Sequence, residues 1–154
     1  MQISQLKKED IENLVKLMHL ADNRSEEWSI SKIKKYMKKE GHVILVAKQK
    51  DIILGYVGIK ELENEDKIIG KILKDSIDKL GCIEWIAVHP KYRRKGIASN
   101  LLVAAESWIR KRKREGVWLD CRKKVIPLYE KNGYKIIGEL NNEKGAKYVL
   151  SKYF

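Results

Sequence analysis

The sequence predicts an α/β protein with a mixed, mostly antiparallel sheet and helices on both faces. Three observations lead to this prediction. Segments rich in strand formers are interspersed with segments of helical spacing along the chain. A buried strand over Cys82–Val88 runs through a tight basic turn into a long helix, and a further strand follows from Val117, which indicates a right-handed parallel crossover. The remaining strands have short connections that favour hairpins.

The composition fits one domain and favours anionic ligands. A chain of 154 residues suits a single core, so we expect residues 1–154 to form one domain. The net charge of +12 favours nucleotides, nucleic acid or an acidic surface, although a lysine-rich composition also gives an ordinary solvated surface. Two cysteines imply no disulfide framework, and the first residues lack the apolar core of a signal peptide. We therefore expect a cytoplasmic protein without membrane association.

The amino-terminal segments predict one strand and two helices. Weak alternation indicates a short strand over Met1–Leu6. Helical spacing then predicts a helix for which Asp10 is the better cap, and a second helix that follows Ser29 and stops at Gly41. A polar loop over residues 21–28 is expected between them. The side chains expected to face inward are Ile11, Leu14, Val15, Met18, Ile30, Ile33 and Met37.

The middle of the chain predicts a hairpin and then a short helix. Strand formers from His42 and from Ile53 flank a polar turn at residues 49–51. The segment Glu63–Lys79 is longer than a tight hairpin connection and has apolar residues at helical spacing. Those residues are Ile69, Ile72, Leu73 and Ile77.

The last segments complete the sheet around one long helix. The helix is expected over Gly96–Glu115, and a strand follows from Val117. A short helix over Ile126–Asn132 ends at Gly133, and two closing strands over residues 134–140 and 146–154 finish the chain. The apolar face of the long helix is expected to contain Ile97, Leu101, Ala105, Trp108 and Ile109.

The turn Arg93–Ser99 predicts a phosphate-binding site. A strand that enters a helix through such a turn presents unpaired backbone N–H groups to an anion. Small residues such as Gly96 let the ligand approach the backbone, and the turn begins with three cations. A dinucleotide fingerprint needs G-x-G-x-x-G, and only Gly96 of its three glycines is present.

Two linked motifs make the chain resemble the GNAT family of N-acetyltransferases. The first is Val88-His89-Pro90 at a strand end, followed by Arg93-x-x-Gly96-x-Ala98 and a helix. The second is the short helix Leu128–Tyr134, with the letters LYEKNGY, and Gly55–Gly58 on an earlier strand extends the similarity. The resemblance covers the carboxyl-terminal two-thirds of the chain well. It implies that the strand over Cys82–Val88 splays from its parallel neighbour at Val117, with the pantetheine arm of acetyl-CoA in the gap.

The resemblance implies acetyl transfer from acetyl-CoA to a primary amine by direct attack in a ternary complex. The pyrophosphate of the cofactor is expected at the basic turn, and the pantetheine arm on the backbone of Ile86 and Val88. The Val88 N–H is then an oxyanion donor; plain core packing is the alternative role for both side chains. The residues expected at the cofactor are Ile86, Ala87, Val88, Arg93, Arg94, Lys95, Gly96, Ile97, Ala98, Ser99, Tyr129 and Lys131.

The resemblance also implies catalytic roles. Tyr129 matches the family tyrosine that protonates the leaving thiolate, with an ordinary core tyrosine as the alternative. Glu84 is the first candidate for the base that deprotonates the amine, and Asp120 is the second; bulk water or a base from the amino-terminal loops are the other options. A carboxylate in the middle of a buried strand is costly unless it is used or paired. Alternation should place Cys82, Glu84 and Ile86 on one strand face. The histidines are scattered, so no metal site is predicted.

Some segments depart from the family or allow other functions. Arg122–Lys124 stands where many family members carry an Asn that contacts the cofactor. The Glu63–Lys79 insert is a candidate for shaping the acceptor site or a homodimer contact. The basic run Arg110–Arg114 is typical of nucleic-acid binding, but cations at a helix end also complement its dipole, which is the favoured interpretation. A cofactor-binding sensor without turnover is the third alternative. A small amine or peptide N-terminus is favoured over a polyamine, with an acceptor mouth bordered by Glu26, Glu27, Glu63, Glu65 and Asp66.

Overall fold

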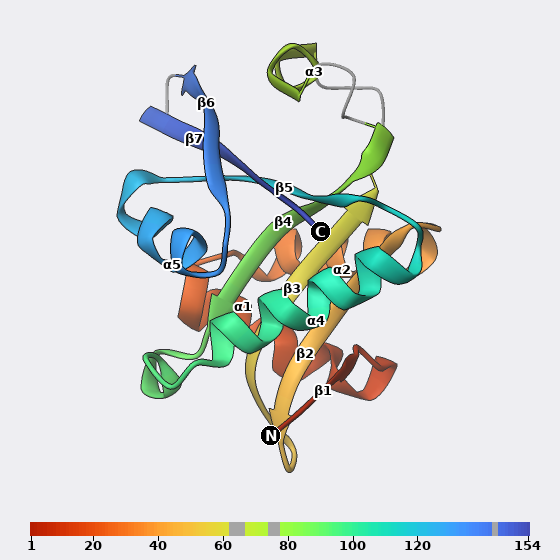
Figure 1. Cartoon of the computed structure of the whole chain (residues 1–154). Coiled ribbons are helices and arrows are strands. Elements are labelled where there is room, and N and C mark those ends of the chain that lie inside the picture. The colour runs from red at the N-terminus through yellow and green to blue at the C-terminus, as the bar shows by residue number, and fades with distance from the viewer. Residues whose placement is uncertain (62–66, 74–77, 143–144) are drawn as a thin grey trace. The chain divides into compact units, whose positions relative to one another are not determined.

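The strands form a mixed sheet in the order β1-β2-β3-β4-β5-β7-β6 (Figure 1), which confirms the predicted mixed α/β class. The computed structural model describes residues 1–61, 67–73, 78–142 and 145–154. The chain divides into a first unit, residues 1–60 and 85–105, and a second unit, residues 61–84 and 106–154. The first half of strand β4 (Leu80–Val88) lies in the second unit, and its second half lies in the first. The single domain expected for residues 1–154 stays a prediction.

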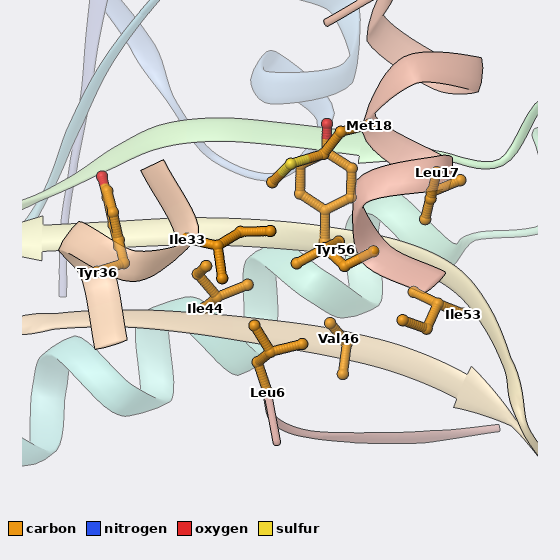
Figure 2. Close-up of a cluster of buried hydrophobic side chains, with 10 residues drawn as sticks. Leu6, Leu17, Met18, Ile33, Tyr36, Ile44, Val46, Ile53 and Tyr56 are labelled. Carbon is orange, nitrogen blue, oxygen red and sulfur yellow. The ribbon is translucent and has the colours of Figure 1, made fainter. Parts of the chain in front are cut away.

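The first unit is an antiparallel sheet with helices on both faces. Strand β1 (Gln2–Gln5) pairs with β2 (His42–Gln49), which forms the predicted hairpin with β3 (Ile52–Glu61). Helices α1 (Ile11–Asp22) and α2 (Glu26–Lys38) cover one face (Figures 1 and 2). The first part of α4 (Ile97–Lys111) covers the other face, where a Cβ added at Gly55 would lie 3.1 Å from Leu101 Cδ1.

The core between α1, α2 and the sheet follows the alternation of the strands. Successive strand residues point to opposite faces, so Ile44, Val46 and Tyr56 meet the two helices (Figure 2). Burial of each such side chain stabilises the fold by about 1.5–3 kcal/mol. The buried residues of this cluster are Leu6, Leu14, Leu17, Met18, Ile33, Tyr36, Ile44, Val46, Ile53 and Tyr56.

Helix α2 begins earlier than the sequence analysis predicted. It starts at Glu26 instead of after Ser29, so the predicted polar loop over residues 21–28 shrinks to a few residues. The cause is the cap: the Ser25 hydroxyl accepts a hydrogen bond from the Trp28 N–H at 3.1 Å, and two glutamates follow in the first turn. The buried face of the helix also differs from the expected one. Ser29, Ile33 and Tyr36 are buried, whereas Met37, expected to point inward, is 42% exposed.

Asp10 stands at the start of α1, but its side chain does not cap the helix. Its carboxylate instead accepts a hydrogen bond from Lys48 Nζ at 2.7 Å. Asp10 is buried, and a buried carboxylate needs a charged partner more than a helix needs one capping bond. Asp10 therefore occupies the predicted cap position, but its side chain bonds to Lys48 and makes no capping hydrogen bond.

The second unit contains the parallel strand pair. The first half of β4 pairs parallel with β5 (Gly116–Cys121), and β5 pairs antiparallel with β7 (Gly145–Tyr153), which pairs with β6 (Lys135–Asn142). The parallel register runs from Leu80–Gly116 to Cys82–Trp118. Beyond it, β5 continues its pairing with β7 as far as Cys121. The parallel pairing therefore covers only the start of β4.

The helices of the second unit agree with the sequence. Helix α3 (Lys67–Leu73) confirms the short helix expected in the insert, and it buries Ile69 and Leu73 against Leu80, Cys82, Trp118 and Val149. Four further residues indicated by the sequence lie outside the described residues, namely Glu63, Glu65, Asp66 and Ile77. Helix α5 (Ile126–Lys131) is the predicted short helix. Among the described residues, no helix is long and apolar enough to cross a membrane.

Helix α4 (Ile97–Lys111) runs from the first unit into the second. It begins directly after Gly96 and ends a few residues before the predicted limit at Glu115. Ile97, Leu101, Ala105 and Ile109 are buried as predicted. Trp108 is half-buried, and the Arg112 guanidinium lies 4.9 Å from the centre of its ring.

Candidate active site

The predicted phosphate-binding turn is a strand–turn–helix connection in the first unit. Strand β4 ends at Val88, a 3-10 turn covers Pro90–Tyr92, and α4 begins at Ile97. Two residues of the turn are left-handed, Arg94 with φ 62° and Gly96 with φ 81°. Left-handed residues in a turn direct successive backbone N–H groups toward one side, and such a concavity binds anions.

The start of α4 is suited to an anion. Its first hydrogen bond runs from the Asn100 N–H to the Gly96 carbonyl at 3.0 Å, so the N–H groups of Ile97 and Ala98 lie before the helical ladder. The first turn contains no acidic residue. A Cβ placed on Gly96 would meet no heavy atom within 4 Å, so the space above its backbone is open. Both the helix dipole and this open approach favour a bound phosphate.

Arg93 differs from the two cations that follow it. Its Nε donates to the Val88 carbonyl at 3.1 Å, and its Nη2 donates to the Ala21 carbonyl at 3.3 Å. These bonds fasten the turn to the end of β4 and to α1. Arg94 and Lys95 are exposed, and Lys95 Nζ lies 5.7 Å from the ring centre of Tyr92. The sequence indicated three equivalent cations, whereas the structure gives the first of them carbonyl partners.

The backbone of β4 presents alternate residues to its two sides. The His89 N–H donates to the Leu54 carbonyl of β3 at 2.7 Å. Because backbone groups of neighbouring residues in a strand point in opposite directions, Ile86 and Val88 direct theirs away from β3. The bond from Arg93 to the Val88 carbonyl agrees with this. The Ala87 carbonyl points the other way, toward β3. A Cβ added at Gly55, on β3, would lie 2.9 Å from its oxygen.

Tyr129 lies in α5, in the second unit. Its side chain is 6% exposed, and its ring meets the ring of Tyr134 edge-on, with 5.9 Å between the ring centres. Burial raises the pKa of the Tyr129 hydroxyl well above its usual range, and the neighbouring Cys121 and Asp120 raise it further. The hydroxyl is therefore protonated at neutral pH, as a proton donor must be. Lys131, also expected at the cofactor, is exposed at the end of the same helix.

The two candidate bases both lie on strands of the second unit. Glu84 is half-buried on β4, and Asp120 is half-buried on β5. Lys147 Nζ lies 3.4 Å from Asp120 Oδ1, so the Asp120 carboxylate has a cationic partner. Both cysteines are buried, and burial, with the charge of Asp120 as a smaller cause, raises the pKa of Cys121 to about 11. A neutral buried thiol behaves as a packing residue.

A buried polar cluster in the second unit was not predicted. Glu106, only 9% exposed, accepts hydrogen bonds from the Tyr134 hydroxyl at 3.0 Å and from Lys152 Nζ at 3.0 and 3.1 Å. The sequence did contain a signal for it. Glu106 lies four residues after Leu102 and three before Ile109, both of which are buried, so a carboxylate occupies the apolar stripe of α4.

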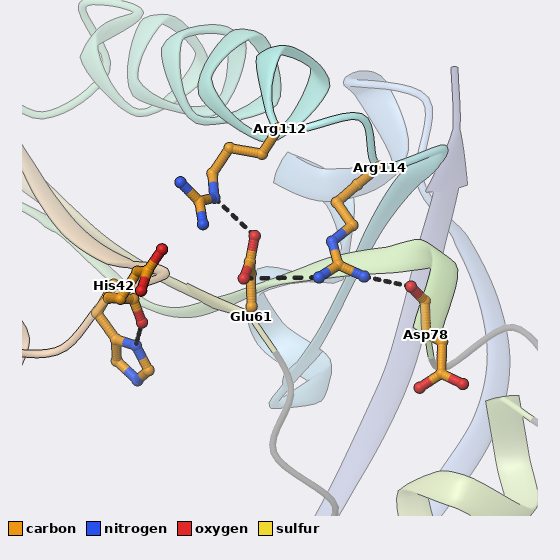
Figure 3. Close-up of polar contacts among 6 residues, drawn as sticks. His42, Glu61, Asp78, Arg112 and Arg114 are labelled. Atoms are coloured by element: carbon orange, nitrogen blue, oxygen red, sulfur yellow. Dashed lines mark hydrogen bonds and ion pairs between the residues drawn. The ribbon is translucent and has the colours of Figure 1, made fainter.

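The basic run at the end of α4 has structural partners (Figure 3). Arg112 Nε donates to Glu61 Oε1 at 2.6 Å, and Arg114 Nη2 lies 3.5 Å from Glu61 Oε2. Arg114 also donates to the Asp78 carbonyl. The hydrogen bond from Arg112 lowers the pKa of Glu61. The Arg110 guanidinium lies 4.4 Å from the ring centre of Phe154. These contacts give the run a structural role, and the favoured helix-dipole interpretation stays a prediction.

A groove in the first unit follows α1 and the start of α2. Its volume is about 850 Å³, and Ile11, Val15 and Ile30 form its apolar lining. Its charged lining residues are Lys8, Glu12, Lys16 and Glu26, and His19 lies beside them. Of the acidic residues expected to border an acceptor mouth, Glu26 lines this groove.

The family comparison agrees with these motifs. A family model described as an acetyltransferase (GNAT) domain matches residues 40–136, which include both the basic turn and the Leu128–Tyr134 segment. The chain therefore belongs to the GNAT family of acetyltransferases, which confirms the resemblance seen in the sequence. A comparison with curated proteins gave no match.

Solved structures share the fold over almost the whole chain. An aminoglycoside 6′-N-acetyltransferase complexed with coenzyme A is 19% identical, with a TM-score of 0.79 over 99% of this chain and 97% of that one. The ribosomal-protein-S18-alanine N-acetyltransferase of Escherichia coli is 18% identical, with a TM-score of 0.73 over 99% and 92%. A Bacillus anthracis protein solved with acetyl coenzyme A is 22% identical, with a TM-score of 0.64 over 79% and 67%. At these identities the likeness concerns the fold.

Proposed function

We propose that the protein is an N-acetyltransferase that transfers the acetyl group of acetyl-CoA to a primary amine by direct attack in a ternary complex. The observation that carries this proposal is the turn before α4, with left-handed Arg94 and Gly96 and the N–H groups of Ile97 and Ala98 before the helical ladder. The pyrophosphate of the donor binds there, and Arg94 and Lys95 add positive charge. Arg93 holds the turn in place through its two carbonyl bonds.

The rest of the donor is bound along β4. Ile86 and Val88 direct their backbone groups away from β3, so they are available to the pantetheine amides. The Val88 N–H donates to the thioester oxygen as negative charge develops on it. One such donor is typically worth about 10²–10³ in rate. Ala87 contributes through packing, because its backbone lies on the β3 side.

Tyr129 acts on the leaving group. Its hydroxyl carries its proton at neutral pH, because a phenol titrates at about 10 even without a shift, so it donates a hydrogen bond to the sulfur as the carbon–sulfur bond breaks. The reaction forms one carbon–nitrogen bond and breaks one carbon–sulfur bond. The proton lost by the amine goes to the base, the thiolate receives one from Tyr129, and solvent returns a proton to the phenolate. A positioned proton donor contributes about 10²–10⁴ in rate.

The amine must lose a proton before it attacks, because an alkylammonium has a pKa of about 10.4. We assign this step to Glu84. Asp120, whose Oδ1 lies 3.4 Å from Lys147 Nζ, is the second candidate. Glu84→Gln should therefore lower the rate more than Asp120→Asn, with the largest difference at low pH, where the free amine is scarce.

The acceptor class is a small amine or a peptide N-terminus. If the acceptor enters along the groove beside α1, it meets two glutamates and two lysines among the lining side chains. Their charges balance, so the groove has no excess negative charge that would favour a polycation. Related folds are named for an aminoglycoside amine and for the alanine of a ribosomal protein, which are amines of these two kinds. We propose that the two units work as a single catalytic domain.

Incubation with acetyl-CoA and a panel of amines tests the proposal. The panel holds amino acids, aminoglycosides, peptides with varied N-termini including alanine, and spermidine, and mass spectrometry detects the acetylated product. We expect a product that falls by about 10²-fold or more in Tyr129→Phe, with Tyr148→Phe as the matched control. Product from spermidine alone would contradict the acceptor class. Coenzyme A binding without any product indicates a sensor, and absence of binding overturns the proposal.

A further inference from the structure

We infer that Glu106 is a positioning residue that acts on Tyr129 through Tyr134. This inference rests on the proposed function, in which the Tyr129 hydroxyl protonates the leaving thiolate. All of the residues involved lie in the second unit, on α4, α5, β7 and the segment that joins α5 to β6.

A hydrogen bond to Glu106 anchors Tyr134 to α4. Tyr134 is 2% exposed, and its hydroxyl donates to Glu106 Oε1 at 3.0 Å. Lys152 Nζ contacts both oxygens of the same carboxylate, at 3.1 and 3.0 Å, and lies 5.7 Å from the centre of the Tyr134 ring. With a hydrogen bond to α4 at one end and burial around the ring, Tyr134 has a single defined orientation.

Tyr134 in turn contacts Tyr129. The two rings meet edge-on at 73°, with their centres 5.9 Å apart. The backbone connects them as well, because the Tyr129 carbonyl accepts hydrogen bonds from the Tyr134 N–H at 3.1 Å and from the Asn132 N–H at 3.0 Å. Tyr134 therefore contacts both the ring and the backbone of Tyr129, and a shift of Tyr134 moves Tyr129 with it.

The presence of the buried Glu106–Lys152 pair needs an explanation. A buried ion pair costs desolvation, and apolar residues of similar volume often give equal or greater stability. Stability alone therefore does not explain a carboxylate in the apolar stripe of α4. What an apolar pair cannot supply is an acceptor that fixes the direction of the Tyr134 hydroxyl. The carboxylate supplies this acceptor, and Lys152 holds it in place.

The side chain of Lys152 also lies against the turn that follows α5. Gly133 has φ +92°, and a Cβ at this position would lie 3.3 Å from Lys152 Cε. The Lys152 chain thus passes over the turn on its way to Glu106. Asn132 Nδ2 also donates to the Leu128 carbonyl at 2.8 Å. The end of α5, which carries Tyr129, is held from two sides, and a displacement near 1 Å in such a group costs up to about 10² in rate.

A double-mutant cycle between Tyr134→Phe and Tyr129→Phe tests the inference. Tyr134→Phe keeps the ring and removes only the hydroxyl, while Glu106 retains Lys152. With acetyl-CoA and an aminoglycoside or alanine-starting peptide, we expect kcat to fall about 10-fold and the KM for acetyl-CoA to stay within about twofold. In the Tyr129→Phe background, Tyr134→Phe should have no further effect, because the group that it positions is already absent.

Each outcome separates the inference from the proposed function. If Tyr129→Phe leaves activity unchanged, the proton-donor role fails and the inference fails with it. If Tyr129→Phe lowers activity but Tyr134→Phe is neutral, or lowers activity equally in both backgrounds, only the inference is overturned. Glu139→Gln, an exposed carboxylate on β6, is the matched control.

A second variant tests whether a loss of activity reflects misfolding, and a second measurement tests the inference without any acceptor. Glu106→Leu with Lys152→Met replaces the pair by apolar side chains, and we expect an intact fold with the same loss of kcat. In the enzyme labelled with ¹³C on its tyrosine rings, Tyr134→Phe should shift the Tyr129 signals, whereas Glu139→Gln should not. Unchanged Tyr129 signals in Tyr134→Phe would overturn the inference without any activity assay.

Discussion

Gly96 offers the sharpest test of the phosphate-binding turn, because its replacement by alanine separates backbone strain from loss of ligand contact. Its φ of +81° is unfavourable for a residue with a Cβ, yet the added atom would meet nothing within 4 Å. Gly145, the first residue of β7, has φ +108° and is equally open. Gly145→Ala is therefore a matched control that introduces similar strain away from the predicted cofactor residues.

The magnitudes follow from these two facts. The left-handed conformation costs an ordinary residue about 1–2 kcal/mol, so each variant should lower the melting temperature by about 2–8 °C. At Gly96 the new methyl group also occupies the open space above the backbone N–H groups. Loss of one hydrogen bond to a charged phosphate costs about 1.5–3 kcal/mol. Gly96→Ala should therefore weaken coenzyme A binding by about 10- to 100-fold, and Gly145→Ala by less than about twofold.

Titration calorimetry with coenzyme A and thermal unfolding followed by circular dichroism measure the two effects separately. ADP, which contains the pyrophosphate but no pantetheine, should show the same loss of affinity in Gly96→Ala. Wild-type affinity in Gly96→Ala, or an equal loss in Gly145→Ala, would refute the assignment of the pyrophosphate to this turn. A loss for coenzyme A but not for ADP would move the contact to the pantetheine arm.

Further predictions concern stability and reactivity. The hydrogen bond from Arg112 lowers the pKa of Glu61 in the fold, so its carboxylate stabilises the protein above the unfolded pKa near 4.5 and ceases to do so as the pH falls through the folded pKa. Urea unfolding of wild type and Glu61→Gln should thus differ at neutral pH and converge in acid; a constant difference would contradict this. Ser25→Ala removes the cap of α2 and should cost about 1 kcal/mol in the same assay, whereas an unchanged midpoint would show that the cap is not needed. Cys82 and Cys121 should resist a disulfide reagent in the native protein and react only in denaturant, because both are buried; rapid labelling of the native protein would refute their burial.

The order of the elements could be predicted from the sequence because it depends on local patterns. The switch between helical and strand spacing gave the hairpin of β2 and β3, and the strand–turn–helix pattern at Gly96 gave the parallel crossover from β4 to β5. The turn at Arg93–Ser99 could be predicted for the same reason, since a glycine-containing turn and a helix start depend on neighbouring residues. The tyrosine motif around Tyr129 follows from seven consecutive letters, from Leu128 to Tyr134.

Errors occurred where a weak local signal was misjudged or where a distant residue intervened. The start of α2 is an error of the first kind: Ser25 and two following glutamates are a sufficient helix start, but the polar composition of residues 21–28 indicated a loop. Asp10 illustrates the second cause. It stands at the predicted cap position, but the fold brings Lys48, on β2, within 2.7 Å of its carboxylate, and the side chain makes no capping bond.

The sequence by itself determined the family, the order of the strands and helices, and the residues of the basic turn and of the Tyr129 helix. Only the tertiary structure decided how their side chains are used. Arg93 bonds to the carbonyl of Ala21, and Glu106 bonds to Tyr134 and Lys152, because folding places donors and acceptors from distant segments within 3.3 Å of each other. The physical reason is that a buried charge such as that of Glu106 must be satisfied wherever a partner lies in space, and spacing along the chain carries no record of that distance.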